Sequence, residues 1–320
     1  LIEQARAFSQ GLTPAGQRSA NAQLLASLSE VAAANPYAQF PTALSAGDIR
    51  DATLLNHLYT KRMVAQDGVN QGAALILCSV GTARQLGIPA RHWVFLHGLA
   101  QGEDYNLSER EDLTRSRMAE MVVDRALAIA GKGMGDIDLI DIYSCFPCAV
   151  SSVAHHLGLP VDGSRALTLT GGLAFFGGPG NNYGMNAIAE AVAQLRSGAG
   201  NCALVSSLGG ILSKHATGIY SLEPSYVNWA EVTTRLSKEV LPARPVVESP
   251  VAGAIASYVV NYRGDEPVQA IIIADTDDGG RFVANSTDRE TVEAMLGPVQ
   301  QGQRVGVVPG DNGALLFNLA

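Results

Sequence analysis

The chain has 320 residues, a formal net charge of −8 at pH 7 and an apolar fraction of 47%. This length leaves room for about two domains. The charge, with no cluster of Lys and Arg, argues against nucleic acid or an acidic membrane surface as the main partner. No apolar run approaches the roughly 18 residues of a membrane span. Four cysteines in mainly apolar contexts are typical of reduced core thiols, so we expect a cytoplasmic protein.

Residues 1–62 are polar and helical in rhythm, and then become rich in turns through "ANPYAQFPTALSAGDI". This texture predicts a surface subdomain with a long excursion. The chain opens on "LIEQARAF", without a Met or a signal-peptide pattern. We therefore expect a fragment from which an N-terminal part is missing.

Residues 63–222 alternate between strand-like and helix-like segments. Apolar runs predict strands at 72–80, 92–100 and 136–143, and two closing strands at 201–210 and 211–221. Patterns with helical spacing lie between them, at 82–89, 116–133, 147–160 and 185–198. Such alternation predicts an α/β unit with a central sheet and helices on its faces.

The last hundred residues have a different texture. Residues 223–244 contain two prolines and are followed directly by a third, Pro245, so they predict a linker. Residues 245–320 contain β-rich runs separated by the turn signals "RGDEP", "TDDGG" and "PGDNG", with one short helix in "RETVEAML". We expect a small β-barrel of the oligonucleotide/oligosaccharide-binding type. Its acidic character argues against nucleic acid as its ligand.

The stretch "TGGLAFFGGPGNNYGM" is rich in glycine but fits neither common phosphate-binding loop. It has no lysine, which a P-loop requires. Tyr183 stands where the third glycine of a dinucleotide fingerprint would be. Phe175, Phe176 and Tyr183 are costly to leave in water, so they predict a loop that folds inward.

Four stretches together resemble the C-terminal half of the thiolase superfamily. "VAQDGVNQGAALILCSVGTARQLGIP" resembles the stretch that opens the second half of thiolases, and "DIDLIDIYSCFPCA" the strand with the Asn-Glu-Ala-Phe or His-Asp-Cys-Phe motif. "TGGLAFFGGPG" resembles the Gly-His-Pro loop, and "SSLGGILSKHA" the Cys-x-Gly loop. In this chain Gly178 stands where the catalytic histidine belongs, and Ser207 where the acid/base cysteine belongs.

The resemblance implies a fold and a ligand. The unit at 63–222 would be the second half of a thiolase fold (βαβαβαββ), and residues 1–62 would be the loop domain over the active site. The extra β-rich module matches thiolase-like proteins of type 1, which are similar to sterol-carrier-protein thiolases. We expect an acyl-CoA ester as substrate, no permanently bound cofactor, and an N-terminal half in the same or a separate chain.

Four side chains and four glycines are the candidate site residues. His215 would replace the missing base, close to Ser207, whose hydroxyl is a poor base without help. Cys145 occupies the cysteine position of His-Asp-Cys-Phe, and Tyr183 resembles the acid/base tyrosines of thiolase-like aldolases. Each also has a structural interpretation: a histidine bonded at a strand end, a packed thiol, a packed aromatic ring. The candidate contacts to CoA are Gly171, Gly172, Gly209 and Gly210.

The sequence leaves several functions open. Cys145 and Cys148 form a C-x-x-C pair, but there is no second pair, so we expect no metal. One hypothesis is an acyltransferase of the acetyl-CoA acetyltransferase type in lipid metabolism, or a retro-aldol lyase acting on a CoA ester. The other is a non-catalytic CoA-binding or scaffold protein. Convergence of His215, Ser207 and Tyr183 on one pocket would favour the enzyme.

Overall fold

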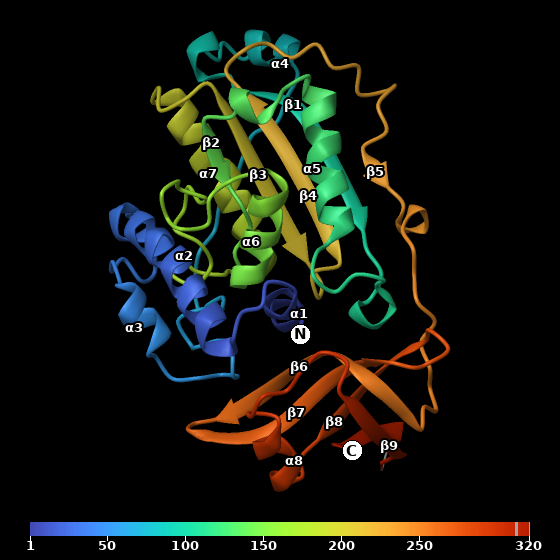
Figure 1. Cartoon of the computed structure of the whole chain (residues 1–320). Helices are drawn as coiled ribbons and strands as arrows, with labels where there is room; N and C mark the ends of the chain where they lie inside the picture. The colour runs from blue at the N-terminus through green and yellow to red at the C-terminus, as the bar shows by residue number, and fades with distance from the viewer. Residues whose placement is uncertain (311–312, 320) are drawn as a thin grey trace.

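The structure is a computed structural model that describes residues 1–310 and 313–319. An α/β unit lies above a small β-barrel, and an extended segment connects the two along one side (Figure 1). Within the described residues, no helix has the length and apolar character needed to cross a membrane.

The α/β unit is formed by the first two thirds of the chain. Its elements, in chain order, are α1 (Ile2–Ser9), α2 (Pro14–Ala34), α3 (Ala46–Arg50), α4 (Val80–Gln85), β1 (Phe95–Glu103), α5 (Arg117–Ala130), β2 (Leu139–Asp141), α6 (Pro147–His156), α7 (Tyr183–Arg196), β3 (Cys202–Gly209), β4 (Lys214–Ser221) and β5 (Arg235–Leu236).

These elements form a five-stranded sheet in the order β2-β3-β4-β1-β5. The pairs β2–β3 and β1–β5 are parallel, and β3–β4 and β1–β4 are antiparallel. Leu204 of β3 packs with residues of α5 and α6, whereas its neighbours Ala203 and Val205 pack with α7. The sheet therefore has α5 and α6 on one face and α7 on the other, as the alternating sequence pattern predicts.

Helix α5 illustrates how the sequence fixes these layers. Ser116 caps its N-terminus, and Gly131, with φ of 61°, ends it in the left-handed conformation. The helix lies so close to β1 that a Cβ atom on Gly98 would be 2.1 Å from the carbonyl oxygen of Ala126. Only glycine permits this approach.

The glycine-rich loop folds inward, as its aromatic residues predict. Phe175, Phe176 and Tyr183 are all buried. Gly171 has φ of +113°, and a Cβ atom there would be 2.4 Å from the Cβ atom of Ala32 in α2. The loop is therefore packed directly against α2.

The predicted strand at 72–80 is wrong. The segment has no regular structure up to the start of α4, and Ile76 and Leu77 are 89% and 87% exposed. No strand in the described part of the chain pairs with it, so its backbone has no ladder partner. The first β of the predicted βαβαβαββ order is consequently an exposed apolar coil.

Residues 1–62 are more deeply embedded than a surface subdomain. Leu25 and Leu28 of α2, together with Ile49 of α3, belong to the same core cluster as Val122 of α5 and Ile140 of β2. The polar texture of the sequence comes from the outer face of α2. Its inner face covers the glycine-rich loop and α6.

The C-terminal part is the closed five-stranded barrel that the sequence predicts, in the order β10-β8-β7-β6-β9. Its elements are β6 (Ala252–Arg263), β7 (Glu266–Asp275), β8 (Arg281–Ser286), α8 (Arg289–Ala294), β9 (Arg304–Pro309) and β10 (Leu315–Leu319). β8 and β10 pair in parallel, and α8 lies between β8 and β9. Phe282 and Phe317 fill the interior.

His57 connects the barrel to the α/β unit. Its backbone N–H donates to the carbonyl of Val260 at 2.9 Å, and its Nδ1 accepts the N–H of Val260 at 3.0 Å. Its Nε2 lies 2.9 Å from Oε1 of Gln4, and its ring stacks on Tyr258 with centroids 4.8 Å apart. Burial disfavours the charged form of the ring and lowers the pKa of His57 to about 3.

We expect His57 to make the protein sensitive to acid. Its pKa is lower in the folded state, so its stabilising contribution is complete above pH 6.5 and is lost progressively as the pH falls toward 3. Chemical denaturation at pH 7.5 and pH 5 measures this. Wild type should lose about 2 kcal/mol more than His57→Phe. Equal losses in the two proteins would refute the assignment, and the exposed His92→Phe should follow wild type.

Candidate functional site

Ser207 and His215 lie on neighbouring strands but point to opposite faces of the sheet. In the β3–β4 register Ser207 is opposite Ala216, and Leu208 is opposite His215. Ser207 Oγ lies 2.3 Å from where a Cβ atom of Gly184, in α7, would be. Because side chains alternate along a strand, Ser207 faces α7 and His215 faces α5. They form no catalytic pair in this structure.

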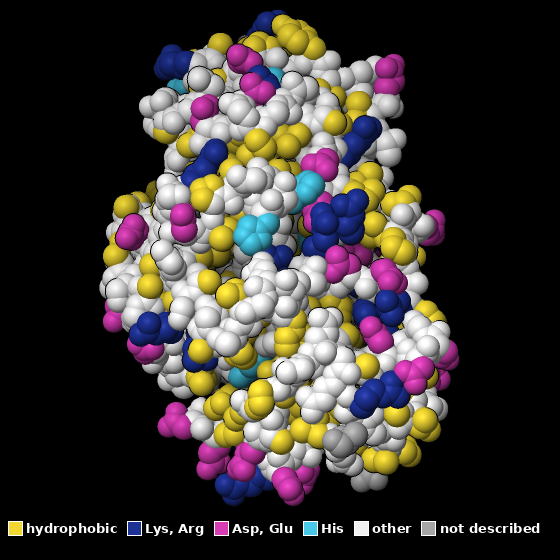
Figure 2. All heavy atoms as spheres, viewed as in Figure 1, with side chains coloured by type: hydrophobic (Ala, Val, Ile, Leu, Met, Phe, Trp, Pro, Cys, Tyr) yellow, Lys and Arg dark blue, Asp and Glu magenta, His cyan; other side chains and the backbone are white. Residues whose placement is uncertain are grey.

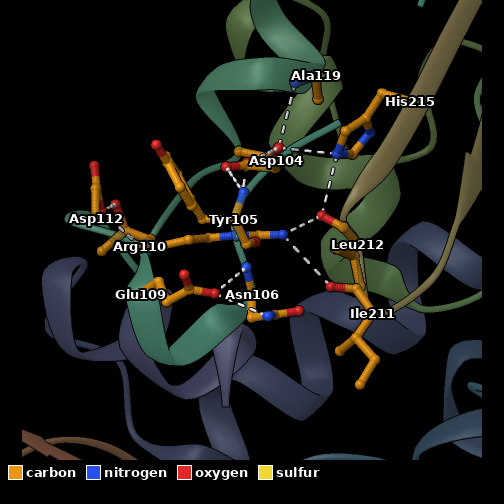
Figure 3. Close-up of polar contacts among 12 residues, drawn as sticks. Asp104, Tyr105, Asn106, Glu109, Arg110, Asp112, Ala119, Ile211, Leu212 and His215 are labelled. Atoms are coloured by element: carbon orange, nitrogen blue, oxygen red, sulfur yellow. Dashed lines mark hydrogen bonds and ion pairs between the residues drawn. The ribbon is translucent and has the colours of Figure 1, made fainter. Parts of the chain in front are cut away.

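His215 belongs to a buried polar network at the start of α5 (Figure 3). Its Nε2 lies 3.0 Å from Ser116 Oγ and 3.1 Å from the carbonyl oxygen of Leu212. The carbonyl can only accept, so Nε2 carries the proton, and the hydroxyl of Ser116 donates to Asp104 at 3.1 Å. Burial, and then the charge of Arg110, lower the pKa of His215 to about 4. The ring is therefore a neutral donor at physiological pH.

Arg110 holds the loop between β3 and β4. Its Nη2 donates to the carbonyl oxygens of Leu212 and Ile211, and its Nε donates to that of Tyr105 at 3.0 Å (Figure 3). Asp104 lies 3.6 Å from its Nε and balances its buried charge. Leu212 has a backbone φ of 50°. A residue other than glycine rarely adopts this left-handed conformation unless its surroundings impose it. The network thus fixes the shape of the loop that follows Ser207.

An open pocket of about 280 Å³ lies at the ends of β1, β3 and β4. Ser207, Gly209 and Ala216 form its floor, on the α7 side of the sheet. Lys214 and Arg235 line it, and Arg235 is 3.3 Å from Glu103. We call this the β3–β4 pocket. His215 contributes to its wall, although the imidazole is bonded on the other side.

Tyr183 is fully buried. Its hydroxyl therefore cannot exchange a proton with a substrate. Its hydroxyl lies 2.7 Å from Thr170 Oγ1 and donates to Asp141 at 3.2 Å. Burial, and then the neighbouring Asp141, raise the pKa of Tyr183 well above its usual value. Tyr183 is thus a packed residue at the start of α7.

Asp141 fastens the glycine-rich loop at both ends. Its Oδ2 accepts the N–H of Leu169 at 2.8 Å and the hydroxyl of Thr168 at 3.0 Å, while Tyr183 at the far end also donates to it. The carboxyl is fully buried, and burial raises its pKa to about 6 against these hydrogen bonds. Asp141 lies within an ordinary strand pattern, which gives no sequence signal for this role.

Cys145 is a packed thiol in this structure. It lies among the apolar residues around Leu208 and Leu212, and burial raises its pKa to about 12. The thiol of Cys148 is buried beside it, with its pKa also raised to about 12. Because the thiolate is the nucleophilic form, neither cysteine is activated. Among residues 1–310 and 313–319, no group of three or more His, Cys, Asp or Glu side chains is placed to bind a metal.

The four candidate glycines separate into two pairs. Gly171 and Gly172 are buried against α2, where Cβ atoms would collide with Ala32 and Leu28. Gly209 lines the β3–β4 pocket, and Gly210 is exposed in the turn that follows. Of the four, only Gly209 lines this pocket.

Another pocket, of about 520 Å³, lies between residues 1–62 and the core. It runs between residues 36–39, residues 70–74 and α7. None of the eight candidate residues lines it.

Besides Asp141, three residues of the site could not be found by sequence reasoning. Asp104, Arg110 and Ser116 lie in the polar stretch between β1 and α5, which resembles any surface connection. A buried Arg in such a connection has no local sequence pattern. Only the N-cap position of Ser116 could be read from the sequence, since serine precedes a clear helical run.

The sheet, its helices and the loops around Ser207 define the second half of a thiolase-like fold with an added barrel. Residues 100–222 match the family "Thiolase C-terminal domain-like", and residues 232–312 match "Thiolase-like protein type 1 additional C-terminal domain". A crystal structure of a monomeric SCP2-thiolase-like protein type 1 from Mycobacterium smegmatis superposes with a TM-score of 0.91 at 40% identity, over 100% of this chain and 72% of that one. The chain belongs to this SCP2-thiolase-like protein type 1 family.

Two further relatives are more distant. An acetyl-CoA acetyltransferase of Methanothermobacter thermautotrophicus is 28% identical over 188 residues, 53% of this chain and 48% of the relative. The chain thus matches about half the length of this curated relative. The structure of an Ltp2-ChsH2(DUF35) aldolase shares the fold, with a TM-score of 0.55 at 18% identity, over 69% of this chain and 61% of that one.

We expect Asp141→Asn to keep the fold and remove a titration. The amide oxygen can accept the loop hydrogen bonds, but it carries no ionisable group. The pKa of Asp141 is raised on folding, so the protonated acid stabilises the protein at low pH, and this contribution is lost as the pH rises through 6. Relative to Asp141→Asn, wild type should lose about 2–3 kcal/mol of unfolding free energy between pH 4 and 7.

Denaturant titrations at several pH values measure this difference. A constant difference between the two proteins would contradict the role of Asp141. As a second variant, Asp141→Ala removes every acceptor and should cost at least about 2 kcal/mol at all pH values.

Proposed function

We propose that this chain is the CoA-ester-binding part of a thiolase-like protein, and that its own residues do not carry out acyl transfer. The observation that carries the proposal is the β3–β4 pocket beside Ser207, where the thiolase resemblance places the thioester. The pocket size, about 280 Å³, suits the thioester end and part of the pantetheine arm better than a whole CoA molecule. Lys214 and Arg235 would donate hydrogen bonds to the carbonyl and amide oxygens of this part of the ligand.

The separation of the candidate residues supports binding rather than catalysis. Claisen chemistry needs a nucleophile, a base and an acid around one carbon atom. Here Ser207 and His215 face opposite sides of the sheet, and Tyr183 is buried. Cys145 is held as a thiol by burial, which raises its pKa to about 12. A retro-aldol lyase that uses Tyr183 is disfavoured for the same reason, since no substrate can reach its hydroxyl.

We also propose that a second thiolase half completes the protein. The M. smegmatis relative has a part without a counterpart here, since the chain covers 72% of it. Segment 72–80 presents Leu75, Ile76 and Leu77 to solvent in an extended apolar run. Such a run is suited to pair as a strand with the sheet of another unit. The four cysteines are free thiols, which supports a cytoplasmic location for the assembly.

We expect calorimetric titration of the full-length protein with CoA and acetyl-CoA to show binding that depends on the β3–β4 pocket. Lys214→Ala should weaken it about tenfold by removing a charge-assisted contact. Gly209→Val should abolish it, because the new side chain fills the pocket. A Cβ atom at Gly209 would lie 3.7 Å from its nearest neighbour, so the fold tolerates the change.

Two variants serve as matched controls for this titration. Lys61→Ala removes an exposed lysine that does not line the pocket, and Gly306→Val adds a side chain to β9 where a Cβ atom meets nothing within 4 Å. Both should bind like wild type. Absence of any CoA binding would replace the proposal with a scaffold that has lost its ligand.

Because of the exposed apolar segment, we expect residues 1–320 expressed alone to have a measurable tendency to self-associate. They should bind a hydrophobic dye and self-associate in sedimentation experiments, because the apolar run has no cover. The double variant Ile76→Asp/Leu77→Asp should reduce both effects without lowering the melting temperature, since neither side chain is buried. A monomer that folds cooperatively and binds no dye would overturn the second-half proposal.

A further inference from the structure

A second polar pocket lies on the other face of the sheet, where α1, the start of α5 and the end of α6 meet. Its volume is about 270 Å³, and its lining includes Arg6, Arg115, Glu120, His155 and His156. In Figure 2, which shows the view of Figure 1, basic and histidine side chains gather on this part of the surface. The β3–β4 pocket is on the α7 side, so one ligand cannot occupy both.

Arg6 is the distinctive residue of this pocket. Only 6% of it is exposed, yet no carboxylate in the described part of the chain lies within 4.0 Å of its guanidinium. It donates to the carbonyl oxygen of Thr114 at 2.9 Å. Glu3, one turn earlier on α1, is bonded instead to Gln17 and Tyr59. A buried cation without a bonded anion is unfavourable, and a bound anion would relieve this.

His155 adds a second donor. Nη2 of Arg6 lies 2.8 Å from Nδ1 of His155, and a guanidinium can only donate. Nδ1 therefore accepts, and the proton of the neutral ring is on Nε2. Burial and the charge of Arg6 lower the pKa of His155, which keeps the ring in this form. Arg6 and His155 thus present N–H groups and no acceptor.

The single acid in the pocket is already neutralised. Glu120 is bonded to Arg115 through Nε at 2.6 Å and to Arg117 through Nη1 at 2.8 Å. His156 is bonded to Asp124 at 2.8 Å. Two arginines therefore balance one buried carboxylate, and the charge of Arg6 is left without a direct partner. The pocket as a whole is suited to an anion.

We propose that this pocket binds the phosphate group of a small phosphorylated ligand, held by Arg6 and His155. A guanidinium fits the geometry of a phosphate through paired N–H donors. The volume exceeds that of a phosphate ion alone, so a phosphate monoester with a small organic group fits better than free phosphate. The site is separate from the proposed CoA pocket and does not depend on it.

Calorimetric titration of the full-length protein with inorganic phosphate and with glycerol 3-phosphate, at constant ionic strength, tests the proposal. We expect both to bind, the monoester more tightly. Arg6→Met should lower the affinity at least tenfold, and so should His155→Leu, which leaves Arg6 in place. Equal affinities would identify inorganic phosphate as the source of the group. Absence of binding to either compound would overturn the proposal.

A melting experiment separates binding from a purely structural role of Arg6. If the site binds phosphate, Arg6→Met should melt no lower than wild type in phosphate-free buffer, and only wild type should gain stability from the ligand. If Arg6→Met melts lower than wild type, and phosphate does not raise the melting temperature of wild type, the role of Arg6 is purely structural. Arg165→Met is the matched control, because Arg165 is partly buried and donates to the carbonyl oxygen of Ile137. Gly209→Val should leave phosphate binding unchanged.

Discussion

The buried carboxylate of Asp141 is the constraint on which the central loop depends. It lies at the end of β2 and accepts hydrogen bonds from the start of the glycine-rich loop and from Tyr183 at the start of α7. Strand, loop and helix therefore converge on one side chain. Gly171 lets the same loop lie against α2, so residues far apart in sequence are held in one rigid unit. Ser207 lies against the helix whose start this unit positions.

Strand alternation then decides what the chain can do. Ser207 and His215 are eight positions apart and lie on adjacent strands, which makes them look like partners. The antiparallel register places them on opposite faces, one in an open pocket and one in a network with Arg110 and Asp104. The same network holds the β3–β4 loop, and the carbonyl oxygen of Arg110 also accepts a hydrogen bond from Arg281 of the barrel. The imidazole of His215 is therefore bonded within this network, and His215 contributes to the β3–β4 pocket only as part of its wall.

Much of the fold could be predicted from local pattern. The helical spacing of α5, with Ser116 before it and Gly131 after it, and the turn signals of the barrel determine elements without long-range information. The strand predicted at 72–80 was wrong because an apolar run becomes a strand only when another strand pairs with it. The site was harder to predict, since the face of the sheet to which His215 points depends on the pairing register of β3 and β4. Arg110 and Asp141 gain their roles only from the backbone groups that the fold brings to them.

Because the barrel and the α/β unit are parts of one chain, the interface between them can be weak and still remain formed. The barrel contacts the α/β unit through His57 and Arg281, and residues 237–251 connect the two parts along one side. A short covalent connection gives two modules an effective concentration on the order of millimolar. An interface that would be too weak for two separate proteins is therefore occupied nearly all the time. Dilution, which separates transient complexes, leaves this pair together.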